Sequence, residues 1–338
     1  MSTNGSFLSS LPALRGLLTY PSQVLEDIAQ KAFVANSWFI PEFTKAAIES
    51  IATEFLDQEA CAQWISKYPK RSDVQQTIAV IVAGNLPLVG FHDLLCILAS
   101  GHKALIKLSE KDSILLPWIT DQWIKIDSSL ASSINYVDRL EGFDAAIATG
   151  SNNSARYFDY YFRAYPHVLR QNRNGVAVLT GEESLEDLRQ LAKDIFLFFG
   201  LGCRNVSKIY VPEGYDFSGW EEAIASWKYL ADHNKYRNNL DYNFAIYIIN
   251  SVPHINLGHL ILKQDDAIAS RIGCVHYSFY KEPNSLSVIL QSRKEEIQCV
   301  VSGEPIAGWE HIRFGQSQHP LLEQYADGVD TMQFLTSL

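Results

Sequence analysis

The 338 residues are 47% hydrophobic and 20% charged, a composition typical of a soluble protein of about two or three domains with a sizeable core. The formal net charge of -10 argues against nucleic acid as the main ligand, because phosphate backbones are bound by clustered Lys and Arg. This charge leaves room for a local basic pocket that binds a phosphorylated cofactor.

The N-terminal stretch "MSTNGSFLSSLPALRGLL" lacks a basic start followed by a long apolar run, so no secretory signal is expected. Apolar runs such as "TIAVIVAG" are far shorter than a membrane-spanning helix, which predicts no membrane insertion. The five cysteines are scattered without CxxC pairs, and the nine histidines form no HExxH or paired-ligand pattern. We therefore expect free thiols in a reducing cytoplasm and no metal site.

Residues 1–72 are predicted to be mostly helical. The stretch "SWFIPEFTKAAIESIATEFLDQEACAQWISKY" repeats apolar residues at helical spacing, and Pro41 suits the first turn of a helix. We interpret this segment as packing or subunit contact, and we expect a homo-oligomer.

Residues 73–167 alternate between short strands and helices. The runs "QTIAVIVAGN", "KALIKLSE", "SSINYVDRL" and "DAAIATGS" are strand-like, and helical patterns separate or follow most of them. This spacing predicts a parallel sheet covered by helices on both faces, in which ligands bind at the carboxyl ends of the strands. Three polar stretches fall at those ends: 84–85, 107–110 and 149–151.

Residues 168–338 form a second predicted α/β domain. It begins with "NGVAVLTG", continues through a predicted helix over "ESLEDLRQLAKDIFLFF", and then reaches the strand "VSKIYV". Farther on, "YNFAIYIIN" is interpreted as a buried strand. The Tyr-, Asn- and Lys-rich residues just before it either line an entrance for the substrate or, as is commoner, form a polar surface helix and loop. The C-terminal tail is expected to pack back or to lie at a subunit interface.

Cys203 lies in the turn "FGLGCRN" between this predicted helix and strand. A lone cysteine is more often a small buried hydrophobe than a nucleophile. Here Gly200 and Gly202 allow close backbone approach, and the N–H groups of a turn can stabilise an oxyanion. Arg204 can help to hold a thiolate, although Arg204 and Asn205 are interpreted as supports of the turn. The remaining thiols in apolar runs keep the buried interpretation: Cys96, Cys274 and Cys299.

Thr149, Gly150 and Ser151 follow a predicted strand and precede a predicted helix. A helix cap is the plain interpretation, because Ser and Thr favour that position. A helix start after a buried strand is also a place where phosphate binds, through free N–H groups and the helix dipole.

The other two polar stretches also have a plain and a functional interpretation. The stretch "KLSE" is either a solvated strand end or a cofactor-binding element in which Lys107, Ser109 and Glu110 hold the ribose. Glu110 suits a ribose 2′-OH and thus NAD(H), whereas Lys107 suits the 2′-phosphate of NADP(H). Asn85 is either a turn residue after Gly84 or a donor to the substrate.

The order of these pieces is more specific than any one of them. The segments "AGNLPLVG", "IKLSEKD", "ATGSNNSAR" and "GLGCRN" resemble, in order and at similar intervals, motifs of the aldehyde dehydrogenase superfamily. Within it, "NSWF", "NLPLVGFHDLL", "FGLGCRNVSKIYV" and "EIQCVV" are similar to fatty acyl-CoA reductases, the family that includes the reductase of bacterial bioluminescence. The resemblance implies an α/β fold with a Rossmann-type nucleotide-binding domain, an α/β catalytic domain and a helical N-terminal segment.

One departure from the superfamily pattern concerns the catalytic base. Hydrolytic aldehyde dehydrogenases carry a glutamate in a Glu-Leu-Gly-Gly stretch about a helix and strand before the cysteine. The corresponding segment here, "VLRQNRNGVAVL", has no acidic residue between Leu169 and Asn174. Because that base activates the water that hydrolyses a thioester, its absence favours acyl-CoA reduction, although a decayed active site would also lack it.

The resemblance implies an NAD(P)H-dependent acyl-CoA reductase, an oxidoreductase that makes fatty aldehyde and CoA from fatty acyl-CoA. Cys203 would form the acyl-enzyme, and Asn85 with the backbone N–H of Cys203 would stabilise the oxyanion. NADP is the expected cofactor, with NAD as the alternative. The competing hypotheses are an aldehyde dehydrogenase that makes free acid and a non-catalytic acyl-CoA- or nucleotide-binding protein that kept the fold.

Overall fold

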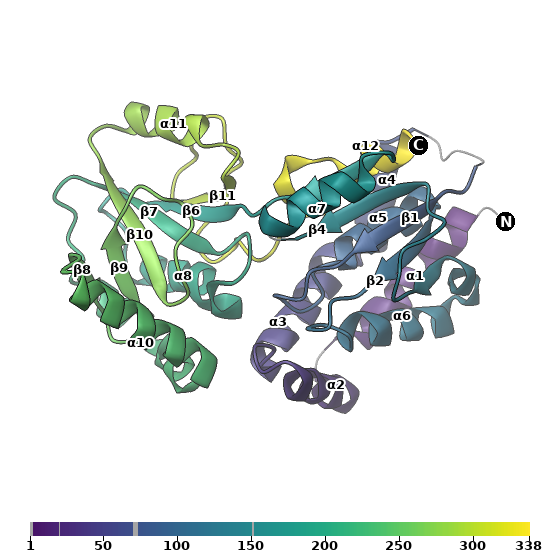
Figure 1. The fold of residues 1–338 in the computed structure, drawn as a ribbon, viewed down its shortest axis with the longest axis horizontal. Coiled ribbons are helices and arrows are strands. Elements are labelled where there is room, and N and C mark those ends of the chain that lie inside the picture. Colours follow the sequence, from purple (N-terminus) through teal and green to yellow (C-terminus); the bar gives the residue numbers. More distant parts are fainter. Residues whose placement is uncertain (1–2, 20, 70–73, 151) are drawn as a thin grey trace. The chain divides into compact units, whose positions relative to one another are not determined.

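The computed structural model describes residues 3–19, 21–69, 74–150 and 152–338. Over these residues the chain folds into two compact units (Figure 1). The first unit contains Met1–Asn172 together with Pro320–Leu338, and the second contains Arg173–His319. The C-terminal segment therefore returns to the unit in which the chain begins.

In the described part of the first unit, the strands form one five-stranded sheet in the order β3-β2-β1-β4-β5. Each neighbouring pair is parallel. This is the order of a doubly wound nucleotide-binding sheet, which leaves a crevice where the strand order reverses between β1 and β4. The strands are β1 (Thr77–Ile81), β2 (Lys103–Lys107), β3 (Ile134–Tyr136), β4 (Ala145–Thr149) and β5 (His167–Arg170).

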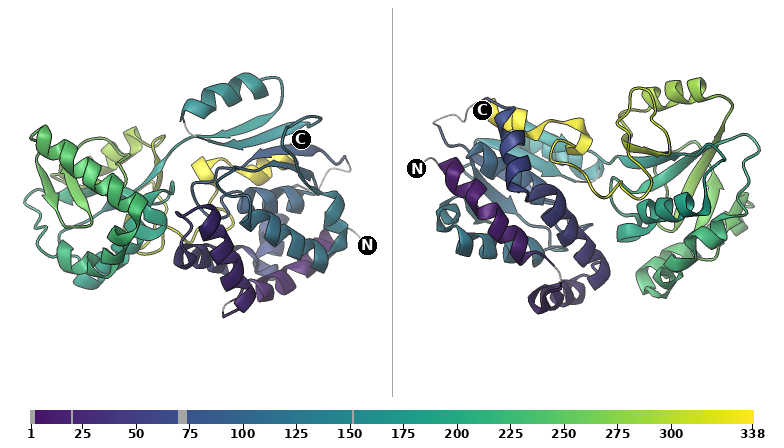
Figure 2. Two further views of the ribbon diagram at one scale, coloured as in Figure 1. Left: turned by 60° about the horizontal axis from the view of Figure 1, so that its bottom comes forward. Right: turned by 180° about the vertical axis from the view of Figure 1, so that it is seen from behind.

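Helices cover both faces of this sheet, as predicted. Figure 2 shows the teal helix α7 on one side of the sheet and the N-terminal helices on the other. Pro41 occupies the first turn of its helix, as its fixed φ favours. The helices are α1 (Thr3–Leu17), α2 (Gln23–Ala35), α3 (Pro41–Ser50) with a π-helical end (Ile51–Phe55), α4 (Gln58–Ser66), α5 (Phe91–Ser100), α6 (Leu115–Ile126), a 3-10 turn (Ser128–Ser132), α7 (Asn152–Phe162), a 3-10 turn (Ala326–Gly328) and α12 (Thr331–Thr336).

The strands of the first unit divide their side chains between two apolar cores. Ile78, Val80 and Ile106 belong to the large core that the N-terminal and C-terminal helices share. Ala79 and Ala148 face the opposite way and pack against α7. The alternation follows from the two-residue period of a strand and explains why both faces are apolar.

In the described part of the second unit, the strands form one six-stranded sheet in the order β11-β6-β7-β10-β9-β8. Its pairs are parallel except for the antiparallel pair of β8 and β9. The strands are β6 (Asn174–Val178), β7 (Val206–Pro212), β8 (His254–Asn256), β9 (Ile261–Gln264), β10 (Cys274–Tyr280) and β11 (Ile297–Ser302).

Helix α11 lies on one side of this sheet, and α8 and α10 lie on the other (Figure 1). The helices are α8 (Leu185–Phe196) with a 3-10 end (Leu197–Gly200), α9 (Trp220–Ile224) with a 3-10 extension (Ala225–Asp232), α10 (Asn234–Ile249) and α11 (Pro283–Ser292). Throughout the described ranges, every helix is too short or too polar to cross a membrane.

The predicted strand at "YNFAIYIIN" is wrong, because these residues belong to α10. The buried side chains of this helix are Tyr236, Leu240, Asn243 and Tyr247, which recur every three or four residues as one face of a helix does. The consecutive apolar residues at its end suggest a buried strand only when they are taken alone. Ile248 and its neighbour 249 are in fact exposed.

The boundaries of the two units differ from those of the domains predicted from the sequence, 1–72, 73–167 and 168–338. The N-terminal helices share one core with the first sheet and so belong to the same unit. Strand β5 extends that sheet past residue 167, and the boundary between the units falls after Asn172. The tail Pro320–Leu338 packs back on the first unit.

Candidate active site

Cys203 lies where the sequence places it, in the turn between α8 and β7. The helix ends at Phe196, and a 3-10 segment leads to Gly200. The turn that follows is closed by a hydrogen bond from the Asn205 N–H to the Gly202 carbonyl, 3.1 Å long. Cys203 is half-buried in this turn.

The other four thiols are buried. Burial raises the pKa of Cys61 and of Cys299 to about 12 and that of Cys274 to about 11. It also raises the pKa of Cys96 well above its ordinary value. A thiol that resists ionisation is a poor nucleophile, which leaves Cys203 as the thiol best placed for chemistry.

Arg204 and Asn205 support this turn through their side chains. The Arg204 guanidinium donates to the carbonyl of Ser317 at 2.6 Å. The Asn205 side chain is fully buried and bonds to backbone groups that precede Cys203: it accepts from the Gly202 N–H and donates to the Leu197 carbonyl. Their interpretation as structural supports agrees with these contacts.

The first unit collects the other predicted site residues at one edge of its sheet. Asn85 is exposed and follows β1 by a few residues. Lys107 is the last residue of β2, and Thr149 is the last residue of β4. Since β2, β1 and β4 are adjacent and parallel, their carboxyl ends meet at the edge where such sheets bind ligands.

The segment after β2 carries side chains suited to a cofactor ribose. Lys107 is exposed, and its ammonium group donates to the carbonyl of Asp138 at 2.5 Å. The hydroxyl of Ser109 accepts from the backbone N–H of Lys111 at 3.2 Å, and Glu110 is exposed. The charges of Lys107 and Glu110 thus both face solvent at the end of β2.

Thr149 and Gly150 are half-buried at the end of β4, and helix α7 begins at Asn152. The first N–H groups of a helix have no partner within the helix and point at whatever lies beyond its start. Ser151 lies outside the described residues. On either side of it, β4 ends at Thr149 and α7 begins at Asn152, which agrees with the predicted change from strand to helix.

The contact between Gly84 and Ser109 brings the ends of β1 and β2 together. A Cβ atom at Gly84 would lie 2.5 Å from the Ser109 hydroxyl oxygen and 2.8 Å from the Lys111 Cβ, so only glycine fits there. Three features suit the binding of a dinucleotide: this close approach, the point between β1 and β4 where the strand order reverses, and the helix that begins after Gly150. The residues that would hold it are Lys107, Ser109, Glu110, Thr149, Gly150 and Ser151.

The resemblance places the hydrolytic glutamate at Arg170 or Gln171, and the first of these is a buried cation. Arg170 is 5% exposed and forms an ion pair with Asp93. Its guanidinium also donates to the Ala326 carbonyl at 2.7 Å and to the Thr331 hydroxyl at 2.9 Å. Arg170 therefore holds the C-terminal segment against β5 and has no capacity to accept a proton.

Besides the ion-pair partners of Arg170 and Arg173, the carboxylate of Asp327 approaches this segment, and sequence reasoning missed it. Asp327 accepts a hydrogen bond from the backbone N–H of Gln171 at 2.7 Å. It comes from the C-terminal segment, 156 residues away, and only the return of that segment to the first unit brings it here. No local pattern in the sequence signals such a contact.

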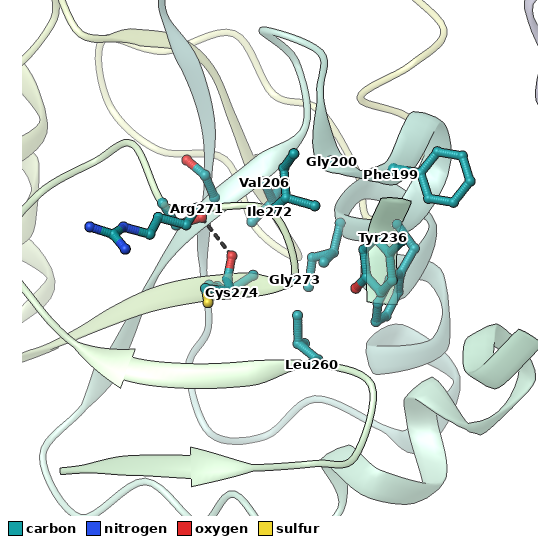
Figure 3. Close-up of a pocket in the computed structure, with 14 residues that line it drawn as sticks. Phe199, Gly200, Val206, Tyr236, Leu260, Arg271, Ile272, Gly273 and Cys274 are labelled. Atoms are coloured by element: carbon teal, nitrogen blue, oxygen red, sulfur yellow. Dashed lines mark hydrogen bonds between the residues drawn. The ribbon is translucent and has the colours of Figure 1, made fainter. Parts of the chain in front are cut away.

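A small cavity in the second unit lies next to the turn that carries Cys203, since Gly200 and Val206 on either side of the turn line it. Figure 3 shows it bordered by Phe199 and Gly200 on one side and by Gly273 and Cys274 on the other, with Tyr236 from α10. Its volume of about 20 Å³ has room for roughly one water molecule. It is too small for an acyl chain, so this cavity is not the substrate entrance that the residues of α10 were considered to line.

No family model matches the sequence, and no curated protein matches it. Solved structures do match. An oxidoreductase from Marinobacter aquaeolei has a TM-score of 0.69 at 12% identity, and the match covers 99% of this chain and 84% of that one. An indole-3-acetaldehyde dehydrogenase from P. syringae, bound to NAD+, has a TM-score of 0.64 at 14% identity, over 89% of this chain and 72% of that one.

A betaine aldehyde dehydrogenase from Staphylococcus aureus, also in complex with NAD+, has a TM-score of 0.65 at 12% identity. The match covers 89% of this chain and 72% of that one. At these identities the likeness establishes the fold. The chain has an aldehyde dehydrogenase-like α/β fold with a Rossmann-type sheet and a helical N-terminus, which confirms the predicted fold class.

Proposed function

We propose that the protein is an acyl-CoA reductase that converts a long-chain fatty acyl-CoA to the fatty aldehyde and free CoA. The observation that carries this proposal is the buried Arg170 at the position of the hydrolytic glutamate, in a chain that keeps a half-buried thiol at Cys203. The fold of nicotinamide-dependent aldehyde oxidoreductases supports the general class of reaction. The resemblance of the sequence to acyl-CoA reductases supports the specific one.

Cys203 acts as the nucleophile in this proposal. Its thiolate attacks the carbonyl carbon of the acyl-CoA thioester, a new C–S bond forms, and the CoA thiolate leaves with the electron pair of the broken bond. The side-chain amide of Asn85 and the backbone N–H of Cys203 donate to the oxygen that becomes negative on the way. Loss of one such donor typically lowers the rate by about 10²–10³.

A reduced nicotinamide cofactor, held by the residues named above, would supply the hydride that the acyl-enzyme thioester needs. Cys203 would then carry the tetrahedral oxyanion of a thiohemiacetal, whose C–S bond breaks with its electron pair passing to sulfur, so that the aldehyde is released and the thiolate is restored. A chain with a buried arginine in place of the hydrolytic base lacks the group that activates water, so in this proposal the acyl group survives until the hydride is transferred. A reductase must keep the acyl group on the enzyme until hydride is transferred, whereas a hydrolytic dehydrogenase must release the acyl group to water.

The preference for NADPH rests on Lys107. An exposed ammonium group at the end of β2 suits the 2′-phosphate of NADPH, with Ser109 as a second donor. Glu110 at the same strand end favours the 2′-OH of NADH. We propose NADPH as the main cofactor and NADH as the alternative.

A second candidate is an aldehyde dehydrogenase that releases free acid. The observation in its favour is Asp327, whose carboxylate lies against the backbone of Gln171 beside the place of the missing glutamate. A carboxylate there could serve as the base that activates water. A non-catalytic acyl-CoA-binding protein is a weaker candidate, because the chain retains both Cys203 and Asn85.

The direct test is incubation of the purified protein with palmitoyl-CoA and NADPH or NADH, with cofactor absorbance, free CoA and hexadecanal measured together. We expect the three to change in equal amounts, with Cys203→Ala inactive. Cys61→Ala, which removes a buried thiol in the other unit, is the matched control and should stay active. NAD+-dependent formation of palmitate from hexadecanal, without acyl-CoA reduction, would replace the proposal with the aldehyde dehydrogenase.

A further inference from the structure

The backbone just before the nucleophile turn is strained. Phe198 and Phe199 have φ values of 55° and 57°, and Gly200 follows with a φ of 71°. Residues with side chains rarely adopt this left-handed conformation, and two in succession require compensation from their surroundings. Such strain persists only where neighbouring contacts fix it, and it gathers at functional sites.

The strained run abruptly ends α8 and redirects the chain toward Cys203. A helix leaves its last carbonyl groups without partners in the helix. Here the carbonyls of Asp194 and Leu197 accept hydrogen bonds from the side-chain amide of Asn205, at 2.9 and 2.8 Å. Both hydrogen atoms of that amide are thereby used to hold the end of the helix.

The other end of the same amide holds the turn. The side-chain oxygen of Asn205 accepts a hydrogen bond from the backbone N–H of Gly202 at 2.8 Å. The backbone N–H of Asn205 donates to the Gly202 carbonyl and closes the turn. Asn205 thus bonds to the residue before Cys203 and to the helix that precedes it. The side chain is completely buried, so water does not compete for these bonds.

A second layer of contacts fixes this arrangement from outside. The Asp194 carboxylate accepts from the backbone N–H groups of Gly315 and Ser317, at 2.6 and 2.9 Å. The Arg204 side chain donates to the Ser317 carbonyl from the other side of the turn. The strip 315–317 therefore ties the end of α8 to the residue that follows Cys203.

The ring of Phe199 completes the support. It is 2% exposed and packs against His233 and Tyr236, with ring centroids 4.6 and 5.7 Å away. These contacts bury the side chain that the left-handed backbone presents. They offset the conformational strain, whereas Asn205 bonds to Gly202, the residue directly before Cys203.

We infer that Asn205 is the positioning residue of the nucleophile turn, because its amide links the strained end of α8 to the backbone that carries Cys203. Since its donors are committed to Asp194 and Leu197, it takes no part in binding the oxyanion. The inference deepens the proposed function, on which its role in catalysis rests. Its structural part can be measured without any substrate.

The test compares Asn205→Ala with Asn243→Ala in the full chain. Asn243 is a matched control: it is also buried in the second unit, but its side chain donates to the Ile272 carbonyl at 3.0 Å and accepts from Arg271, and neither partner belongs to the turn. The three measurements are amide hydrogen exchange at Gly202, the rate at which iodoacetamide alkylates Cys203, and kcat with KM for palmitoyl-CoA and NADPH. The melting temperature of each variant is recorded alongside.

For Asn205→Ala we expect faster exchange at Gly202, an altered alkylation rate, and a kcat lower by about 10²-fold with KM little changed, the loss typical of a reacting group displaced by about 1 Å. Asn243→Ala should lower only the melting temperature. If Asn205→Ala does not fold, Asn205→Asp decides, because it keeps the acceptor for Gly202 and loses the two donors. Wild-type exchange, alkylation and kcat in a folded Asn205 variant would overturn the inference.

The two proposals fail in different ways. If the wild type does not reduce acyl-CoA, the proposed function is wrong, but hydrogen exchange and alkylation still report whether Asn205 holds the turn. If the wild type is active and the folded Asn205 variants match it in all three measurements, the positioning role is wrong and the function stands.

Discussion

At the scale of the residue, the proposed loss of hydrolysis rests on Arg170. The resemblance places the hydrolytic base at Arg170 or Gln171, and Arg170 is a buried cation paired with Asp93. Removal of one partner from such a pair usually costs about 3–5 kcal/mol, because the other charge stays buried and alone. Arg170→Glu would place two carboxylates in that site, so the neighbouring exposed Gln171 is the better position for restoring a base.

Substitution of Lys107 tests which of the two cofactors, NADPH or NADH, the protein prefers. Lys107→Ala should weaken NADPH binding by about 10- to 100-fold if its ammonium meets the 2′-phosphate, because a charge-assisted hydrogen bond is lost. NADH binding should change little. Fluorescence titration of both cofactors measures the difference.

Lys103 provides the control, since it lies at the opposite end of the same strand, β2. Lys103→Ala should bind both cofactors as the wild type does. An equal loss of NADPH and NADH in Lys107→Ala would place Lys107 on a ribose hydroxyl that the two share. Unchanged binding of both would remove Lys107 from the site.

At the scale of the elements, the C-terminal segment is held partly by a neutral histidine. His92 on α5 hydrogen-bonds to the Leu322 carbonyl at 3.0 Å, and its ring lies 6.2 Å from that of Trp64 and 5.5 Å from that of Tyr325. Burial lowers the pKa of His92 to about 4. The unfolded chain binds this proton near pH 6.5, so the fold loses stability as the pH falls from there toward 4.

We therefore expect the unfolding free energy to fall by about 2 kcal/mol more in the wild type than in His92→Gln between pH 7 and pH 5. The glutamine keeps a side-chain donor for Leu322 and does not titrate in this range. Urea unfolding at the two pH values gives the comparison, with the exposed His319→Gln as the control. Parallel losses in the wild type and His92→Gln would show that the acid sensitivity arises elsewhere.

Elements with a simple apolar pattern could be predicted from the sequence. Strands β1, β2, β4, β6 and β7 appear where short apolar runs end in glycine or polar residues, because such runs suit a sheet that is covered on both faces. The strand predicted within α10 was wrong, since Asn243 and Tyr247 are buried polar residues that hide the helical period. The sequence also gave no sign of the short strands β5, β8 and β9.

The turn that carries Cys203 was predictable only in part. Glycines around Cys203 indicate a turn, but nothing local indicates that two phenylalanines precede it in left-handed conformation. The contact of Asp194 with Gly315 and Ser317 joins residues more than 120 apart in the chain. Such long-range support depends on the packed fold, which local patterns do not encode.

At the scale of the whole molecule, the C-terminal segment packs back, one of the two outcomes expected from the sequence, and it does so on the first unit. Trp64 donates to the Tyr325 hydroxyl at 2.8 Å, and His102 hydrogen-bonds to the Leu335 carbonyl at 2.9 Å. These contacts, with those of Arg170, make the last residues part of the first unit. They also bring Asp327 beside Gln171, which is why a search for acidic residues limited to 169–174 was incomplete.

The central claim is that this chain protects an acyl-enzyme from water, and the lifetime of that species tests it most directly. Intact-protein mass spectrometry would follow the acyl group on Cys203 after a pulse of palmitoyl-CoA without cofactor. General-base assistance usually contributes about 10²–10⁴-fold, so the wild-type acyl-enzyme should persist and Gln171→Glu should shorten its life with release of palmitate. Rapid hydrolysis by the wild type, slowed by Asp327→Asn, would contradict the claim and identify Asp327 as the base of an acid-forming enzyme.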